Sequence, residues 1–317
     1  MNGGRPRVAV VGAGAWGRNI VRNLAELGAL AAVVDPSPEI RAGLQQQYPG
    51  LRTFAEFASI LSGNYDAVAI AAPVPLHFEL GCAALRAGLD VFIEKPITQT
   101  SREAEDLTAL ARARKRVLMV GHLLLYQPAV RWMKHYLQSE ELGELYGVHL
   151  ERLTLGRVRS VESVLWDLGV HDIAVILDLA GEQPLRIRAA GHRILRAHLE
   201  DDIYVHFDFP SGLRADLHTS WLWPETQRRM IVRGDKGMLL YNEVQQTVTL
   251  YRKTITADLK NHDEGSELIY QGHGQPLKLE MEHFLARIRD RKPALSDGRS
   301  AVAVMRVMEE VSRILEV

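Results

Sequence analysis

The chain is poor in cysteine and in net charge, and it has no long apolar run. Its 317 residues include a single cysteine, Cys82, which excludes disulfides within the chain and metal sites made of several thiolates. The formal net charge of -1 gives no reason to expect nucleic acid or an anionic membrane as a partner. No apolar stretch is as long as a membrane span, and the N-terminal residues lack the apolar segment of a signal peptide. These absences predict a cytoplasmic protein with neither membrane nor nucleic-acid partners.

Apolar residues are plentiful, and in the first part of the chain they fall into short runs. Hydrophobic residues make up 47% of the sequence, ample for a large core, and the length suggests two domains of ordinary size. Strand-like runs at 7–11, 29–34, 67–71, 90–93 and 117–120 alternate with helical stretches such as 76–87 and 101–113. This alternation predicts a doubly wound parallel sheet with right-handed crossovers. Ser101 is the expected N-cap of the helix at 101–113.

The pattern changes after about residue 122. Apolar residues occupy every second position in 202–209 and again in 213–221, with Pro210-Ser-Gly212 between them, which predicts an antiparallel hairpin with one covered face. Further strands are expected at 146–155, 230–233, 238–241 and 247–251, and helices at 128–138, 277–289 and 300–315. We therefore expect an α/β protein, with a Rossmann domain at 1–122 and an α/β domain at 123–317 that holds a large, mostly antiparallel open sheet with helices on one side.

A glycine motif joins the first strand to the first helix. In Gly12-x-Gly14-x-x-Gly17, the first glycine permits the tight turn, the second lets backbone approach a pyrophosphate, and the third lets the helix pack on the strand. The N–H groups at the start of the helix then hold the phosphates. Asp35 follows at about the spacing, some 20 residues, at which a carboxylate binds the ribose hydroxyls. Because Pro36 comes next, with no cation to neutralise a 2′-phosphate, the sequence favours NAD over NADP.

Polar residues follow the later strands of the same domain, where ligands of such sheets bind. Ala72-Pro73 and His77 follow the third of these strand-like runs, Glu94-Lys95 the fourth, and His122 the fifth. Most lysines are solvated surface residues, but that reading poorly explains Lys95, which ends a strand on a turn fixed by Pro96. For His77 and His122, a purely structural hydrogen-bonding role in the loop is an equally good reading.

A second constellation lies in the stretch 165–181. Asp167 and His171 are four residues apart, so they share one face if the helix includes both. A carboxylate beside a histidine raises its basicity and orients its ring, as a general base requires. Two alternatives remain open. In the first, Asp167 caps the N-terminus of the helix and His171 has no catalytic role. In the second, Asp167, His171 and Asp172 bind a cation, although no second cluster of ligands supports a metal.

Taken together, these motifs resemble the Gfo/Idh/MocA family of oxidoreductases over nearly the whole chain. Glu94-Lys95-Pro96 followed by Asp167-x-x-x-His171-Asp172 is the most specific part of the likeness. The resemblance implies a domain with a large open sheet that packs into dimers or tetramers. It also implies that Lys95, His171 and Asp167 act on a sugar or polyol hydroxyl, and since no second ligand cluster appears in the sequence, no metal is expected. The residues expected to contact NAD are Gly12, Gly14, Ala15, Trp16, Gly17, Asp35, Ala72, Pro73, His77, Glu94 and Lys95.

The stretches 16–23, 121–130 and 155–167 are similar to family members that act on UDP-N-acetyl sugars. The likeness implies oxidation of the 3-hydroxyl of UDP-N-acetylglucosamine, for a diamino-sugar pathway such as that of lipid A. Arg157 and Arg159 would grip the pyrophosphate, unless they belong to a solvated basic loop. Expected substrate contacts are Lys95, His122, Tyr126, Arg157, Arg159, Asp167 and His171. Other readings are a dehydrogenase of a free sugar or inositol, an enzyme that recycles tightly held NAD, and a non-catalytic sensor of NAD or a nucleotide sugar.

Overall fold

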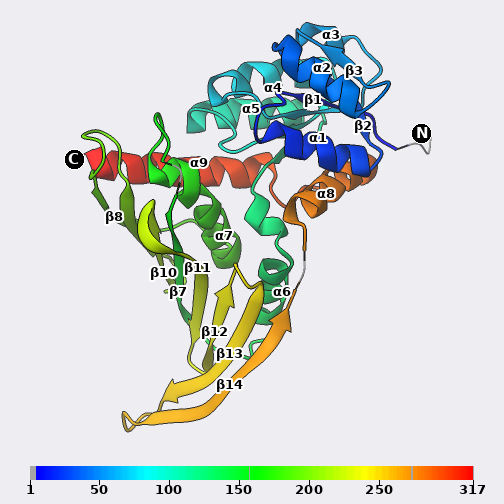
Figure 1. Ribbon diagram of the computed structural model, residues 1–317. Coiled ribbons are helices and arrows are strands. Elements are labelled where there is room, and N and C mark those ends of the chain that lie inside the picture. Colours follow the sequence, from blue (N-terminus) through cyan, green and yellow to red (C-terminus); the bar gives the residue numbers. More distant parts are fainter. Residues whose placement is uncertain (1–4, 157, 273, 317) are drawn as a thin grey trace. The chain divides into compact units, whose positions relative to one another are not determined.

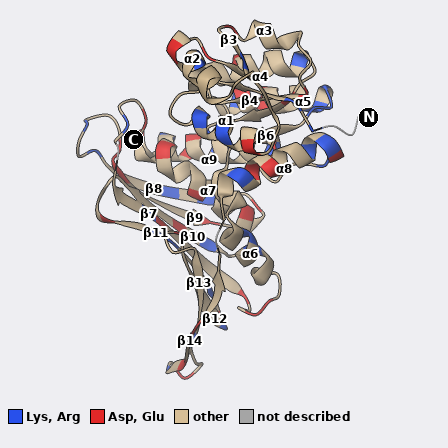
Figure 2. Cartoon of the chain, turned by 45° about the vertical axis from the view of Figure 1, so that its right-hand side comes forward, with Lys and Arg blue, Asp and Glu red and all other residues tan. Residues whose placement is uncertain are grey.

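A computed structural model describes residues 5–156, 158–272 and 274–316, and the chain divides into two compact units (Figure 1). The first unit comprises Met1–Leu123 and Gln275–Met305, and the second comprises Leu124–Gly274 and Arg306–Val317. The C-terminal part of the chain is thus shared between the two units. Acidic and basic residues are interspersed over the described parts of both (Figure 2). Among the described residues, no helix combines the length and apolar character needed to cross a bilayer.

The first unit is built on a six-stranded parallel sheet. Its strands are β1 (Val8–Val11), β2 (Leu30–Val34), β3 (Arg52–Phe54), β4 (Ala67–Ile70), β5 (Asp90–Ile93) and β6 (Leu118–Val120), in the order β3-β2-β1-β4-β5-β6. The helices are α1 (Gly17–Glu26), α2 (Pro38–Gln47), α3 (Ala58–Leu61), α4 (His77–Arg86), α5 (Ser101–Ala113), α8 (Pro276–Asp290) and the first part of α9 (Gly298–Glu316). The strand order reverses between β1 and β4, which is where doubly wound sheets bind their ligands. The predicted parallel sheet is confirmed; β3, which is only three residues long, was not predicted.

The N-cap prediction for α5 was wrong by one residue. Thr100 is the cap, because its backbone is extended and its side chain accepts the N–H of Glu103. The Glu103 carboxylate in turn accepts the N–H of Thr100, which completes a capping box. Ser101 is the first helical residue.

The second unit is built on an eight-stranded sheet. Its strands are β7 (Leu145–Leu155), β8 (Arg186–His192), β9 (Asp202–Asp208), β10 (Arg214–Ser220), β11 (Leu222–Gly234), β12 (Gly237–Asn242), β13 (Thr247–Ile255) and β14 (Asn261–Gln271). The order is β14-β13-β12-β11-β7-β10-β9-β8, and only the β7–β10 pair is parallel. The predicted hairpin is confirmed as β9 and β10. The predicted mostly antiparallel sheet is confirmed as well.

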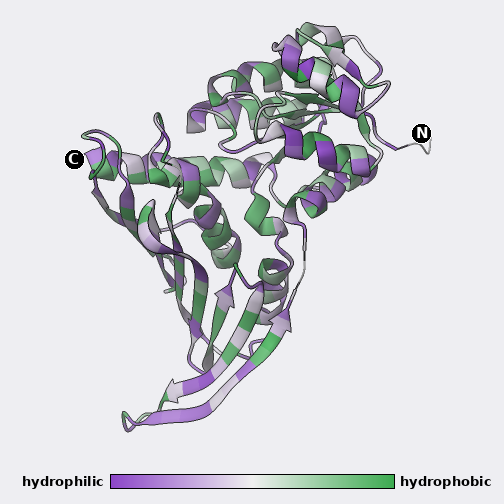
Figure 3. Ribbon diagram, in the orientation of Figure 1, coloured by the Kyte–Doolittle hydropathy of each residue, from purple (hydrophilic) through white to green (hydrophobic). Residues whose placement is uncertain are grey.

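The two faces of this sheet differ. Leu217 pairs with Leu150 and Val205 on a buried face, which α6 (Pro128–Leu137) and α7 (Val170–Ala180) contact. One residue along, Asp216 pairs with His149 and His206 on the other face. This alternation gives the strands their striped hydropathy (Figure 3).

Candidate active site

The glycine motif of the first unit has the geometry that dinucleotide binding needs. Gly12 has φ of +83°, and a Cβ there would lie 2.7 Å from the carbonyl oxygen of Ala71. A Cβ on Gly17 would overlap the carbonyl of Gly12, so only glycine allows α1 to pack this closely. Around Gly14, by contrast, no atom lies within 4 Å of a built Cβ. The fold requires glycine at the first and third positions, whereas the second leaves open space for a ligand to approach the backbone.

Asp35 stands at the carboxyl end of β2, and its side chain is only 5% exposed. Its Oδ2 accepts the N–H of Ala13 at 2.8 Å, and its Oδ1 accepts the N–H of Ser37 at 3.0 Å. The expectation that no cation lies near Asp35 was wrong. Arg41, on α2, donates from Nη1 to the carbonyl oxygens of Asp35 and Pro36 at 2.7 and 2.8 Å. One turn of helix brings this guanidinium back to the end of the strand, which adjacency in sequence cannot reveal.

Trp16 links the glycine motif to the Glu94-Lys95 turn. Its indole Nε1–H donates to Oε1 of Glu94 at 2.5 Å, and the N–H of Lys95 donates to Oε2 at 3.3 Å. Glu94 is 8% exposed, and burial raises its pKa to about 7, against the opposing effects of Trp16 and Lys95. Gly121 packs against this carboxyl, since a Cβ there would lie 2.9 Å from Oε2. Residues that follow β1, β5 and β6 therefore meet at one edge of the sheet.

His122 belongs to the same edge. It is 3% exposed, and neither ring nitrogen has a hydrogen-bond partner among the described residues. Burial, and then the positive charge of Lys95, lower its pKa to about 4. His122 is therefore a neutral imidazole close to Lys95, with polar atoms free to serve a ligand or an ordered water.

His77 has a structural environment. Its Nδ1 lies 2.9 Å from the carbonyl oxygen of Pro96, and its Nε2 lies 2.8 Å from that of Ala72. Burial lowers the pKa of His77, and a neutral imidazole can donate to only one of these carbonyls at a time. The ring thus joins the Ala72-Pro73 loop to the turn after Lys95. This is the structural hydrogen-bonding role that the sequence left open for His77 beside contact with NAD.

The second unit carries the remaining predicted residues. Asp167 is 8% exposed and lies in a π-helical turn, Leu165–Gly169, which runs directly into α7 and the half-buried His171. The helix therefore includes both residues, with a wider first turn of a kind frequent at functional sites. Arg159 donates from Nε to Oδ1 of Asp167 at 3.1 Å, and Tyr126 is buried. Arg157 lies outside the described residues.

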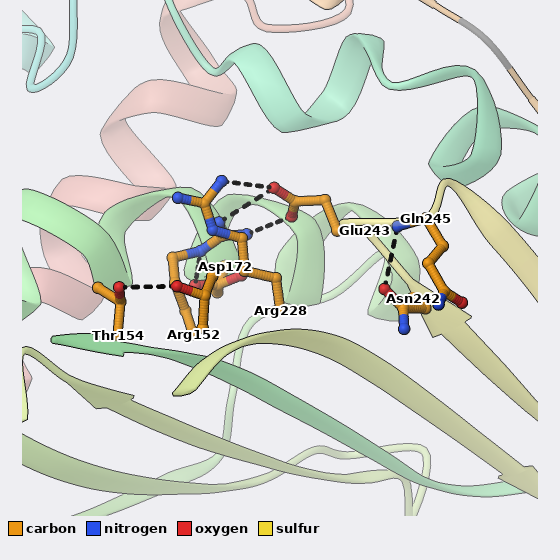
Figure 4. Close-up of polar contacts among 8 residues, drawn as sticks. Arg152, Thr154, Asp172, Arg228, Asn242, Glu243 and Gln245 are labelled. Atoms are coloured by element: carbon orange, nitrogen blue, oxygen red, sulfur yellow. Dashed lines mark hydrogen bonds and ion pairs between the residues drawn. The ribbon is translucent and has the colours of Figure 1, made fainter. Parts of the chain in front are cut away.

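Asp172, the neighbour of His171, is fully engaged in an ion network (Figure 4). Arg152, on β7, binds it with Nε and Nη2 at 2.7 and 3.0 Å, and reaches Glu243 with Nη2 at 2.7 Å. Arg228 adds a second cation to Glu243. Burial raises the pKa of Asp172 and Arg152 opposes this, whereas the two arginines outweigh burial at Glu243 and lower its pKa. Asp172 is thus held by Arg152, and the described residues contain no group of three or more metal-ligating side chains.

The structure brings together two sets of predicted residues, one in each unit. The first unit gathers the glycine motif, Asp35, Glu94, Lys95 and His122, and the second gathers Arg159, Asp167 and His171. Sequence reasoning missed Arg41, the Arg152–Glu243 network, and Glu280, a fully buried acid on α8. A signal for Glu280 existed, because it stands four residues before Phe284 on the apolar stripe of a predicted helix.

Known proteins match both units. Residues 6–122 match a family model described as an oxidoreductase family with an NAD-binding Rossmann fold, and residues 130–240 match the GFO/IDH/MocA C-terminal domain. UDP-N-acetylglucosamine 3-dehydrogenase from Acidithiobacillus ferrooxidans is 29% identical over 98% of each chain. A solved structure of that enzyme superposes with a TM-score of 0.87 at 28% identity, again over 98% of each chain. Inositol 2-dehydrogenase from Corynebacterium glutamicum is 27% identical over 67% of this chain and 66% of its own.

Proposed function

The chain belongs to the Gfo/Idh/MocA family of oxidoreductases, and from this premise we propose that it oxidises the 3-hydroxyl of UDP-N-acetylglucosamine with NAD. One observation carries the choice of substrate. The similar UDP-N-acetylglucosamine 3-dehydrogenase spans 98% of this chain, whereas the similar inositol dehydrogenase spans 67%. The likeness therefore includes the whole second unit, where a substrate-specific contact would be found.

The first unit is an NAD-binding Rossmann domain. Its residues fit the cofactor, because Gly14 leaves space for the pyrophosphate, and because the Asp35 carboxylate ends β2 at the position that binds ribose hydroxyls. When bound, NAD supplies the acceptor for the hydride of the alcohol.

We assign three roles to residues of this chain. Lys95 donates a hydrogen bond from Nζ to the reacting oxygen and favours its developing negative charge. His171 takes the hydroxyl proton on a ring nitrogen, and Asp167, which precedes it in the π-helical turn, orients the pair. In support, Lys95 lies at a crowded polar edge of the first unit, and Asp167 is held by Arg159.

Arg159 is also proposed to bind the pyrophosphate of the substrate, together with Arg157. Its side chain is 45% exposed, and its bond to Asp167 uses Nε, so the terminal nitrogens remain available to phosphate oxygens. An Arg159→Lys variant keeps the charge but loses the planar set of donors.

The second candidate is a dehydrogenase of a free polyol, which the likeness to inositol 2-dehydrogenase favours. A panel experiment separates the two. The purified protein is mixed with NAD, or with NADP, and with UDP-N-acetylglucosamine, free N-acetylglucosamine or myo-inositol, while NADH absorbance is followed. We expect NADH from the nucleotide sugar alone. Full activity on free sugar or inositol would overturn the proposal.

Two controls cover the other readings of the sequence. If NADH is held and recycled in place, bound NADH accumulates without net turnover until a keto sugar is added. If the protein is a sensor, no hydride moves with any substrate. The second outcome is not expected, because a sensor needs no base such as His171.

The proposal also covers the oligomeric state, the cellular location and the pathway of the protein. We infer a homodimer or homotetramer, because the open eight-stranded sheet has an outer face, carrying the exposed His206 paired with Asp216 at 2.6 Å, on which a second copy can pack. Light scattering after size exclusion tests this, and a monomer would contradict it. A cytoplasmic location and a role in supplying diamino sugars for lipid A are part of the same proposal.

A further inference from the structure

Glu280 is an acid in an unusual place. It lies on the buried side of α8 with 1% of its surface exposed, and neither carboxyl oxygen has a hydrogen-bond partner among the described residues. An ionised carboxylate in such a place has a large desolvation cost that no hydrogen bond from the described residues offsets, so the neutral acid is favoured.

Packing places Glu280 beside Glu94. Phe284 is one helical turn after Glu280 on α8, and Phe92, on β5, is two residues before Glu94, which directly follows the strand. The rings of Phe92 and Phe284 are in contact, with centroids 5.8 Å apart, so α8 packs against β5 within one helical turn of Glu280 and two residues of Glu94. Burial raises the pKa of Glu280 well above its ordinary value, and the negative charge of Glu94 raises it further.

The two acids have unequal surroundings. Glu94 accepts the indole N–H of Trp16 and the N–H of Lys95, and it lies beside the Lys95 charge, whereas Glu280 has none of these. His122, at the same edge of the sheet, is neutral near pH 7 and adds no charge beside the two acids. Two adjacent buried carboxyls do not both ionise, so the single negative charge belongs on Glu94, and the proton that remains belongs on Glu280.

We propose that Glu280 is a positioning residue of the NAD site: it stays a neutral carboxylic acid, packs against the Glu94 carboxylate, and so keeps that anion bonded to Trp16 of the glycine motif. Trp16 directly follows the open Gly14-Ala15 segment, so the Glu94–Trp16 bond holds the loop that approaches the pyrophosphate. Glu280 touches no cofactor atom in this account and acts only through Glu94 and Trp16.

The protonation state is tested by infrared spectroscopy of the full chain in D2O, well above the Glu94 pKa of about 7. A band of a protonated, buried carboxyl is expected in the wild type and should vanish in Glu280→Gln. Glu282→Gln, an exposed acid on the same helix, is the matched control and should keep the band. A wild-type spectrum without such a band, or one that Glu280→Gln leaves unchanged, would overturn the proposal.

The positioning role is tested by NADH binding, followed by nucleotide fluorescence without any sugar. Glu280→Gln, which mimics the neutral acid, should bind within about twofold of the wild type, and Glu280→Ala about tenfold more weakly. In a Trp16→Phe background, Glu280→Ala should add less than about twofold, because the bond through which it acts is already gone.

Additive losses in the double variant, or an equal loss in Glu280→Gln and Glu280→Ala, would contradict this role. If Glu280→Ala fails to fold, NADH binding by Glu280→Gln and by the wild type is compared across pH. A neutral Glu280 predicts the same pH midpoint in both proteins, whereas a shifted midpoint in Glu280→Gln would show that Glu280 is ionised. No sugar enters these experiments, so their failure leaves the proposed reaction untouched.

Discussion

Each unit buries acidic side chains, and one pair of these acids in each unit shows two different ways of accommodating the charge. In the second unit, Asp172 and Glu243 share the guanidinium of Arg152, with N–O distances of 2.7 Å to each, and the charges are compensated (Figure 4). In the first unit, Glu94 has an indole and a backbone N–H, while Glu280 has no hydrogen-bond partner among the described residues.

The difference distinguishes buried acids that stabilise the fold from buried acids that serve a ligand site. The compensated charges join the helix that follows Asp167 to the sheet, and Arg152 opposes the rise in the pKa of Asp172 that burial causes. Uncompensated groups have displaced pKa values, as Glu94 and His122 do, and such groups gather where ligands and protons are handled.

The largest expected effect comes from breaking the compensated network. Arg152→Met leaves the buried Asp172 without its cation and leaves Glu243 with Arg228 alone, so we expect the free energy of unfolding to fall by about 3–5 kcal/mol in urea titrations. Arg102→Met, which removes an exposed partner of Asp106, is the control and should cost well under about 1 kcal/mol. Equal losses in the two variants would show that the network does not hold the fold.

A second, smaller effect tests the uncompensated groups through pH. In the folded chain the pKa of Glu94 is about 7 instead of 4.5, so the folded state binds this proton more tightly than the unfolded state. The resulting stabilisation is present below pH 4.5 and is lost as pH rises through 7. For His122 the folded pKa is about 4 instead of 6.5, so its contribution is present above 6.5 and lost as pH falls through 4.

The two slopes oppose each other in the wild type. The quantity to compare is the unfolding free energy at about pH 8 minus that at about pH 5. Relative to the wild type, this difference should be more positive by roughly 2 kcal/mol in Glu94→Gln and more negative by a similar amount in His122→Asn. Urea titrations at both pH values measure this. Slopes of the same sign in the two variants would refute the displaced pKa values.

The smallest effect concerns Asp35, an acid whose two carboxylate oxygens each accept a backbone N–H. Asp35→Ser removes the charge that repels a 2′-phosphate while Arg41 remains beside it, so the preference for NADP relative to NAD should rise about tenfold. Dissociation constants for both cofactors measure the ratio. The double variant with Arg41→Gln should lose the gain, and an unchanged ratio in Asp35→Ser would exclude Arg41 as a phosphate ligand.

The structural features that the sequence patterns predicted correctly have local physical causes. The glycine motif was predicted with its roles, because Gly12 and Gly17 are required by contacts within one strand-turn-helix unit. Strands with one buried face were predicted from their alternation. By contrast, β8 and β14 have no buried residue, so no apolar alternation marks them, and they form by pairing at the sheet edges.

The same limit applies to the site. Lys95 and His171 were selected from motifs, but the bond from Trp16 to Glu94 joins residues 78 apart, and Arg152 meets Glu243 across 91. Such pairings depend on tertiary packing, so they are absent from any local pattern. Arg41 shows the limit at short range, where one helical turn brings a cation to Asp35 that the neighbouring Pro36 does not suggest.

The most direct test of the proposed reaction is the rate of hydride transfer from UDP-N-acetylglucosamine to NAD in Lys95→Ala and His171→Ala, with NADH affinity measured alongside. We expect the rate to fall by about 10²–10⁴-fold in each variant while NADH still binds. Oxidation at a near wild-type rate in both variants would contradict the assignment of these residues to the reacting hydroxyl.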